Sequence, residues 1–482
     1  MELQAKQDRL IERANEIMQT IIRNADAIVT CNENDDVYFD VDLLIDGNQI
    51  GAIGKNLTVN SNDEVQIIDA KGKFIYPGLI NTHHHFFQVF VRNLITIDYP
   101  RMKVVDWLRE IYTIFEKINA EVVYYSSLTA MGDLAKHGCT TVFDHHYCFT
   151  QASGPKTIDE QMLAAEQLGL RFHAGRGTNT LPMSEGSTIP DAMLETTDLF
   201  ISECERLIDR YHDPSPFSMK QIVVAPCQPV NCYKETFVQA AELARDRSVR
   251  LHTHLGEGEN ENMIQRWGKR TLDWCEEIEF AGEDVWYAHG WELLPDEYER
   301  MGKLGTGVTY CPAPAIMGGF PVLNIPDMQR KGVVVSLGCD GSSTNDSSNL
   351  LESLRLAYLM QTFKNKERSE SLTPYEVLKL ATVEGALTLG RSDIGSLVPG
   401  KAADLFAVDV ENFACTGATH DAKNLLAKVG VHDTVWLTIV NGEIVFHNGE
   451  LKRVNEQQLV REAEEVCDRV LRGPFKSYYY GG

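Results

Sequence analysis

Residues 77–85 read Pro-Gly-Leu-Ile-Asn-Thr-His-His-His, a short apolar strand that ends in three histidines. In an extended segment the side chains alternate, so residues two apart point to the same side. We therefore expect His83 and His85 to converge, while His84 points elsewhere. Two converging imidazoles at a strand end are suitable ligands for a divalent metal ion such as Zn²⁺ or Fe²⁺.

This strand begins a long alternation of apolar strands and helical stretches, from about residue 74 to residue 389. Such an alternation is typical of βα units and a parallel sheet. It predicts an α/β fold, a (β/α)₈ TIM barrel, in which the chemistry lies at the carboxyl ends of the strands. The eight predicted strands are 74–80, 140–143, 171–174, 222–225, 249–252, 285–288, 307–310 and 333–337.

The two ends of the chain have a different pattern, rich in strands and turn dipeptides. Residues 41–53 are two apolar strands around an Asp-Gly-Asn turn, and residues 403–446 repeat this style around Asn-Gly. They predict a small β-sandwich-like domain built from both termini, residues 1–73 and 391–482 with a terminal helix, beside a barrel at 74–390. Apolar spacing also predicts an amphipathic helix over 10–21, before a strand at 22–31.

The composition is that of an ordinary globular protein, with 482 residues of which 43% are hydrophobic and 24% charged. Lys and Arg number 45 against 69 Asp and Glu, and the net charge of −24 repels nucleic acid and acidic membranes. Eleven scattered cysteines without a Cys-x-x-Cys motif argue against a disulfide framework and favour the reducing cytoplasm. We therefore expect a cytoplasmic protein, a homo-oligomer, with no nucleic-acid or membrane partner.

Other titratable residues follow later predicted strands. His252-Thr253-His254-Leu255-Gly256-Glu257 ends the fifth, His289 ends the sixth, and Asp340 follows the eighth. Packing requirements alone rarely place so many such groups at strand ends. Spacing leaves His252 a competitor of His254, because both lie on one face of the strand. Three further histidines are expected to have structural or supporting roles: His84, His145 and His146.

Together, residues 77–85, 252–257, 288–290 and 338–341 resemble the amidohydrolase superfamily, specifically its cytosine/guanine-deaminase-like branch. The resemblance covers essentially the whole chain. It implies that one metal ion is bound, Zn²⁺ or alternatively Fe²⁺, and that His252 is not a ligand. Two-metal members usually carry a bridging lysine after the fourth strand, where this chain has Ala-Pro-Cys-Gln at 225–228. The implied ligands are His83, His85, His254 and Asp340.

The same resemblance implies three catalytic residues. Asp340 would accept a proton from the attacking water as well as bind the metal. His289 would hold and polarise that water. Glu257 would protonate a ring nitrogen and later the departing amine, as a general acid does.

Within the branch, residues 172–177 and 340–349 resemble both hydroxyatrazine ethylaminohydrolases and 8-oxoguanine deaminases, and residues 186–193, 272–276 and 289–292 favour the former. After Cys-Pro, deaminases commonly have Ser-Ser-Asn or Thr-Ser-Asn, whereas this chain has Ala-Pro-Ala at 313–315. The resemblance thus implies a hydrolase that acts on C–N bonds and removes an amine or alkylamine from a nitrogen heteroaromatic ring, as hydroxytriazine ethylaminohydrolases do. The alternative is a deaminase of 8-oxoguanine or another purine or pterin.

Four side chains are candidate contacts to a small aminoheterocycle. Gln88 carries both a hydrogen-bond donor and an acceptor, Trp107 and Trp291 could flank a flat ring, and Arg176 ends the third strand. The alternatives to amine release are dechlorination, or hydrolysis of a cyclic amide, with the same metal site, and metal binding without catalysis. Dechlorination is disfavoured by Glu257, because a chloride leaving group needs no proton, and a metal-binding relative without catalysis is disfavoured by the intact Glu257 and His289.

Overall fold

The structure is a computed structural model that describes residues 19–59, 65–93, 102, 104–365 and 367–472. The helix expected over residues 10–21 falls mostly outside this part. Its last residues, 19–21, belong instead to the first strand, β1 (Gln19–Val29), which begins earlier than expected.

Eight parallel strands form the barrel, which confirms the expected fold class. Hydrogen bonds between neighbouring strands follow the chain order from β6 to β14. The seam between the first and last strand is joined by the Thr82 amide, 3.2 Å from the Leu337 carbonyl oxygen, and by a short parallel pair, β7 (His84–His85) with β15 (Asp340–Gly341). The barrel strands are β6 (Leu79–Asn81), β8 (Cys139–His146), β9 (Arg171–Arg176), β10 (Lys220–Val224), β11 (Arg250–Leu255), β12 (Val285–His289), β13 (Gly307–Tyr310) and β14 (Val335–Leu337).

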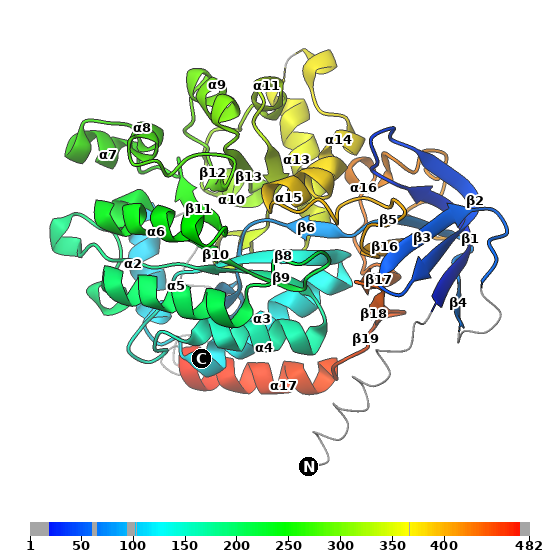
Figure 1. Cartoon of the computed structure of the whole chain (residues 1–482), viewed down its shortest axis with the longest axis horizontal. Helices are drawn as coiled ribbons and strands as arrows, with labels where there is room; N and C mark the ends of the chain where they lie inside the picture. The colour runs from blue at the N-terminus through cyan, green and yellow to red at the C-terminus, as the bar shows by residue number, and fades with distance from the viewer. Residues whose placement is uncertain (1–18, 60–64, 94–101, 103, 366, 473–482) are drawn as a thin grey trace, which may run out of the picture.

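Helices surround the barrel, and the carboxyl ends of its strands point to the left in Figure 1, away from the second sheet. The connecting helices are α3 (Ala120–Lys136), α4 (Thr157–Leu168), α5 (Thr197–Tyr211), α6 (Lys234–Asp246), α7 (Asn260–Trp267), α8 (Thr271–Glu277), α9 (Pro295–Leu304), α10 (Pro312–Met317), α11 (Ile325–Arg330), α12 (Ser342–Asn345) and α13 (Leu350–Lys364). No helix in the described part of the chain is long and apolar enough to span a membrane.

The second sheet combines both ends of the chain, as expected, and lies at the right in Figure 1. Its strands are β1, β2 (Val37–Asp46), β3 (Gln49–Gly54), β4 (Val65–Asp69), β5 (Lys73–Pro77), β16 (Leu405–Asp409), β17 (Leu437–Val440), β18 (Glu443–His447) and β19 (Glu450–Leu451). After these strands comes α17 (Glu456–Val466), which packs on α3, and a short π-helical segment (Cys467–Arg472) ends the described part of the chain. The remaining helices are α2 (Val104–Phe115), α14 (Pro374–Leu380), α15 (Val383–Thr388) and α16 (Leu425–Lys428).

The strand expected at 74–80 is wrong as a single barrel strand. It is divided at Gly78: β5 pairs with β1 and β16 in the second sheet, and only β6 belongs to the barrel. At the crossing, a Cβ on residue 78 would lie 2.1 Å from Oγ1 of Thr140. Only glycine fits there, so the chain can pass closely from one sheet to the other.

A buried ion pair joins the two sheets. The Arg171 guanidinium on β9 donates to both carboxylate oxygens of Asp404, at 3.0–3.2 Å, and both side chains are almost fully buried. The backbone amide of Asn441 also donates to Asp404, at 2.6 Å. The amino end of the barrel is therefore fixed to the second sheet, and the opposite end is left free for chemistry.

Replacing Tyr76 tests how much the contact between β5 and the C-terminal segment contributes to the free energy of unfolding. Its buried hydroxyl donates to the Ala422 carbonyl at 2.8 Å. We expect Tyr76→Phe to lower the free energy of unfolding by about 1 kcal/mol, because a buried hydrogen bond is lost. A lower urea midpoint with an unchanged slope would show this. The control is Tyr38→Phe in β2, where the ring is exposed; equal effects of the two variants would contradict the expectation.

Candidate metal centre and active site

Four histidine rings meet at the carboxyl ends of the barrel strands. The ring centre of His83 lies 4.7 Å from that of His85, 5.0 Å from that of His254 and 5.1 Å from that of His289. All four are buried. His84 instead turns away and lies 3.0 Å from the Ser348 hydroxyl, as the alternation of side chains predicted.

Backbone carbonyls fix the tautomers of two of these rings. Nδ1 of His85 lies 2.7 Å from the carbonyl of His145, and Nδ1 of His254 lies 2.8 Å from the carbonyl of Cys227. A carbonyl only accepts, so both Nδ1 atoms carry hydrogen and both Nε2 atoms present lone pairs. Those two Nε2 atoms are 3.1 Å apart. Two lone pairs at this distance repel unless a cation lies between them.

A proton between the two Nε2 atoms is disfavoured, because burial and the neighbouring imidazoles of His85 and His289 lower the pKa of His254 well below its ordinary value.

A histidine relay fixes the third ring. Nδ1 of His252 lies 2.9 Å from the Trp286 carbonyl, so it carries the hydrogen and its Nε2 must accept. That Nε2 lies 3.0 Å from Nδ1 of His83, which therefore donates. Nε2 of His83 is left with a lone pair, buried and without a hydrogen-bond partner among the described residues. This arrangement places His254 with the converging pair His83 and His85, and His252 behind His83, so the geometry favours His254 as the predicted ligand.

Asp340 brings the carboxylate. Its Oδ1 lies 3.4 Å from Nε2 of His83 and 3.3 Å from Nε2 of His85. The residue has φ of 64°, a left-handed conformation that non-glycine residues adopt only in a small minority of cases. Burial alone would raise the pKa of Asp340, but the facing imidazoles of His289, His83 and His85 lower it well below the ordinary value.

The donor set fits a divalent metal ion. Three imidazole lone pairs and one carboxylate oxygen converge with no hydrogen left to share among them. Neutral imidazole and carboxylate are the ligands that Zn²⁺ and Fe²⁺ prefer. A second grouping of His83, His145 and His252 fits less well, because the facing nitrogens of His83 and His252 already bond to each other and Nε2 of His145 donates to the Ala225 carbonyl.

Glu257 and His289 face each other beside this centre. Oε1 of Glu257 lies 3.6 Å from Nε2 of His289, and the Glu257 side chain keeps 34% of its surface exposed. Enclosure by the protein and the charges of Asp340 and Glu259 raise the pKa of Glu257 well above its ordinary value. Burial lowers the pKa of His289 to about 3, so its ring is neutral. Neither ring nitrogen of His289 has a hydrogen-bond partner in the described part of the structure.

Aromatic rings line one side of the pair. Trp291 lies 4.3 Å from the ring of His289 and stacks on Phe320 at 4.5 Å. Phe320 is held by its amide, which donates to the Ala315 carbonyl at 2.9 Å. The segment that carries the Ala-Pro-Ala departure therefore supports an apolar wall next to the catalytic candidates.

The other candidate substrate contacts have different surroundings. Oε1 of Gln88 accepts from the Ser343 hydroxyl at 2.5 Å, against the backbone of Gly341. Trp107 is buried on α2 in the main apolar core. Their roles in substrate binding stay predictions.

Arg176 does not join the cluster. On β9 the neighbouring Gly175 faces the barrel interior, because a Cβ there would meet Phe143, so the Arg176 side chain points to the outer layer. There the guanidinium forms two hydrogen bonds with Glu195, at 2.8 and 2.9 Å, and lies 3.5 Å over the ring of Phe149. The expectation that Arg176 contacts the substrate is therefore not supported by its position.

Sequence reasoning expected structural or supporting roles for His145 and His146 but did not show how the supporting groups are connected. The relay from His252 depends on carbonyls of neighbouring strands, which no spacing reveals. The inward position of His145, whose ring stacks on His254 at 4.7 Å, could have been found, since it follows from the alternation along β8. His146 points outward to Thr157, at 3.0 Å.

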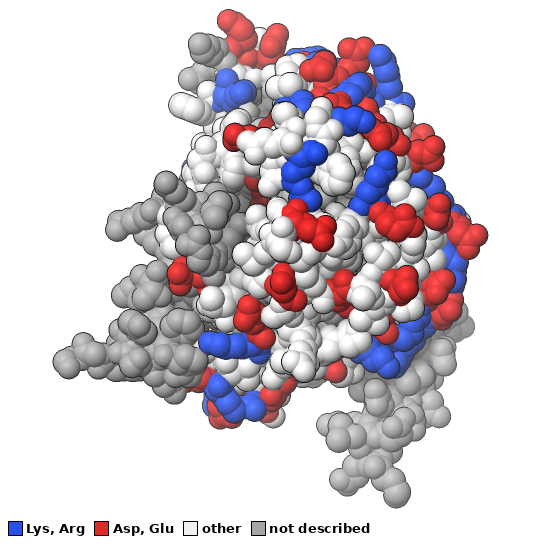
Figure 2. Space-filling model, turned by 90° about the vertical axis from the view of Figure 1, so that its left-hand side faces the viewer, with Lys and Arg blue, Asp and Glu red and all other residues white. Residues whose placement is uncertain are grey.

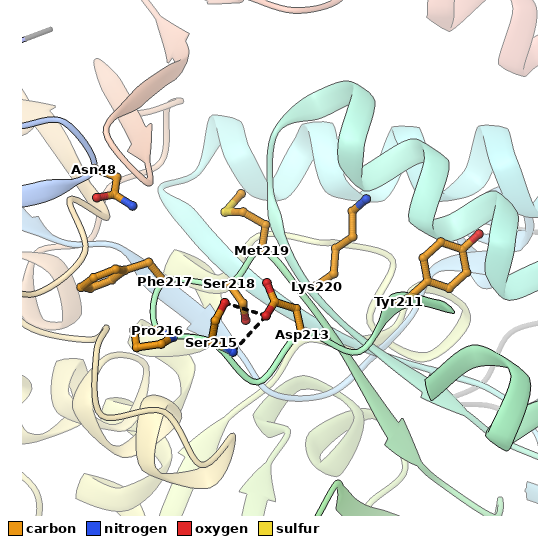
Figure 3. A pocket seen from close by; sticks show the side chains of 9 residues that line it. All are labelled: Asn48, Tyr211, Asp213, Ser215, Pro216, Phe217, Ser218, Met219 and Lys220. Carbon is orange, nitrogen blue, oxygen red and sulfur yellow. Dashed lines mark hydrogen bonds between the residues drawn. The ribbon is translucent and has the colours of Figure 1, made fainter. Parts of the chain in front are cut away.

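A cleft of about 410 Å³ lies at the opposite, amino end of β10, lined by residues that include Asp213, Phe217 and Lys220. Figure 3 shows Asp213 bonded to Ser215 and no group of converging metal-binding side chains. The face at the carboxyl ends of the barrel strands carries Asp and Glu beside Lys and Arg in Figure 2.

Comparisons with known proteins agree with this geometry. The sequence profile of the amidohydrolase family matches residues 74–445. A hydroxydechloroatrazine ethylaminohydrolase from Pseudomonas sp. (strain ADP) is 49% identical over 441 residues, 90% of this chain and 92% of its own length. An 8-oxoguanine deaminase from Pseudomonas aeruginosa is 34% identical, over 74% of this chain and 79% of its own.

Among solved structures, an atrazine chlorohydrolase from Arthrobacter aurescens TC1 complexed with zinc is 30% identical with a TM-score of 0.88, over 93% of this chain and all of that one. The fold, the family profile and the relatives agree with the resemblance noted from the sequence. The chain belongs to the amidohydrolase family.

Proposed function

We propose that this protein removes an alkylamine from a hydroxytriazine, with one Zn²⁺ per chain held by His83, His85, His254 and Asp340. The observation that carries the proposal is the 49% identity to an ethylaminohydrolase over 90% of the chain. The apolar wall of Trp291 and Phe320 supports it, because such a wall accepts an alkyl group that a small polar pocket would exclude.

A divalent ion in this site would lower the pKa of a bound water toward about 7 and so supply a nucleophile at neutral pH. Asp340 is placed to take the proton that this water loses. The neutral His289 is placed to accept or donate a hydrogen bond to the water, because both of its nitrogens lack a partner among described residues. These two residues prepare the attack on the ring carbon.

Glu257 would act on the substrate ring and on the leaving amine. Its raised pKa means that it keeps its proton at a higher pH than a free glutamate does. It can therefore protonate a ring nitrogen, which makes the adjacent carbon more electrophilic. It then takes the proton of the hydroxyl group added to that carbon and passes it to the departing amine, and the proton held by Asp340 restores Glu257 for the next cycle. An amine requires this proton, whereas a chloride does not. Glu257 thus favours amine release over dechlorination.

The test is a release assay for ammonia and alkylamines over oxo-purines, pterins, pyrimidines and hydroxytriazines. We expect ethylamine from hydroxyatrazine. An apolar pocket discriminates by only about 1–3 kcal/mol per methylene, so side activity on free-amine substrates is also expected. Activity on 8-oxoguanine with no measurable ethylamine from hydroxyatrazine would instead make the protein a purine deaminase.

A further inference from the structure

The loop that presents Glu257 has little stiffness of its own. Glu257 lies between Gly256, with φ of 70°, and Gly258, with φ of 99°, both in the left-handed region that glycine tolerates. A catalytic group on such a loop keeps its position only if other groups fix the backbone. Groups outside residues 256–258 must therefore hold this loop.

Glu259 holds the first half of the loop. Its side chain turns back, so that Oε1 accepts the amide of Gly256 and Oε2 accepts the amide of Glu257, each at 2.6 Å. The side chain is buried, with 6% exposed. Hydrogen bonds to a carboxylate are shorter and stronger than those between neutral groups. The two peptide groups that precede the Glu257 Cα are therefore tied to one carboxylate.

Glu292 holds the second half from a different strand. Its Oε2 accepts from the amide of Gly258 at 3.2 Å and from the amide and side chain of Asn260, at 3.3 and 2.8 Å. Its own amide donates to the Gly256 carbonyl at 3.0 Å. Glu292 follows His289 after β12, so these bonds join the loop of Glu257 to the loop of His289.

Helix capping does not account for Glu259. The residue precedes α7 (Asn260–Trp267), where a capping side chain would accept from amides inside the helix. The Glu259 side chain makes no such bond; it accepts from the two amides before it at 2.6 Å and, more weakly, from Nε2 of Gln228 at 3.5 Å. Its hydrogen bonds serve the loop and not the helix.

We propose that Glu259 is a positioning residue that fixes Glu257 opposite His289, and that Glu292 couples the two loops. The proposal rests on the proposed function, since it assigns Glu257 the proton transfer. Two amides need two acceptors, and a carboxylate supplies both. Glutamine has the same shape but presents one oxygen and one NH₂ group, so Glu259→Gln breaks one of the two bonds with little change in volume.

The experiment compares Glu259→Gln, Glu257→Gln and the double variant in the metal-loaded full chain. Displacing a catalytic group by about 1 Å costs up to about 10²-fold in rate, so Glu259→Gln should lower kcat by about 10- to 10²-fold at unchanged KM and metal content. The lost buried hydrogen bond should lower the melting temperature by only a few degrees. In the Glu257→Gln background the same change should cost nothing more, because residues that act through one another are not additive. The control is Glu261→Gln, an exposed carboxylate two residues further on.

A second measurement does not need activity. Hydrogen exchange at the amides of residues 256 and 257 should accelerate in Glu259→Gln and stay unchanged in Glu261→Gln. Unchanged exchange, kcat within about twofold of the parent, loss of metal, or an equal loss in both backgrounds would each overturn the proposal. If the parent protein turns over no aminoheterocycle, the proposed function fails, and the exchange measurement alone then decides the role of Glu259.

Discussion

Asp340→Ala should abolish turnover and remove the metal together. The Asp340 carboxylate is the charged member of the donor set, 3.3 and 3.4 Å from two imidazole nitrogens. Without it the three histidines alone would have to hold the ion, and the acceptor for the water's proton would be lost. The purified parent protein should contain about one Zn²⁺ or Fe²⁺ per chain, because one donor set fills one site. Elemental analysis and amine release on the same samples measure both effects, and His83→Ala should behave in the same way.

The control for this prediction is His84→Ala. His84 sits between two of the predicted ligands in the sequence but points to Ser348, so its removal should leave the metal in place. Metal loss in His84→Ala with retention in His83→Ala would show that the assignment of strand faces is wrong. Two tightly held equivalents in the parent protein would contradict the single site.

Glu257→Gln should lower turnover by between about 10² and 10⁴, the range that general acid–base catalysis contributes. Glutamine keeps the size and hydrogen bonding of the side chain but has no proton to transfer. Because Glu257 is not among the predicted ligands, metal content should match that of the parent. Steady-state kinetics on an alkylamino-hydroxytriazine, with metal analysis of each preparation, gives the comparison. Turnover near the parent level would remove Glu257 from the mechanism.

The hydrogen bonds from Glu259 and Glu292 to the loop of Glu257 give the prediction for Glu257→Gln a structural basis. Glu257 has only a 3.6 Å contact to His289 through its side chain, whereas the backbone that carries it is tied by short bonds at 2.6 Å. The position of Glu257 is therefore set mainly by the hydrogen bonds of its backbone. A partly exposed carboxylate can in this way be accurately placed and still reach a substrate.

Much of the fold was predictable from local patterns. Alternating apolar strands and helical stretches predict parallel βα units because each unit buries its own apolar face, and the chain-order pairing of eight strands follows. The error at 74–80 has a local cause as well. An apolar strand that crosses between two sheets looks like one strand in sequence, and only the close approach of Gly78 to Thr140 reveals the break.

The sequence by itself determined that His83 and His85 converge and that His84 does not, because a strand's alternation is a property of the local backbone. Only the tertiary structure placed His254, and not His252, beside the converging pair, since the carbonyls of Trp286 and Cys227 on neighbouring segments set which nitrogen carries hydrogen. The tertiary structure also pairs Arg176 with Glu195 and places the Glu259 carboxylate against the Glu257 amide. Hydrogen bonds between distant segments depend on where the strands pack, and spacing along one strand carries no information about its neighbours' carbonyls.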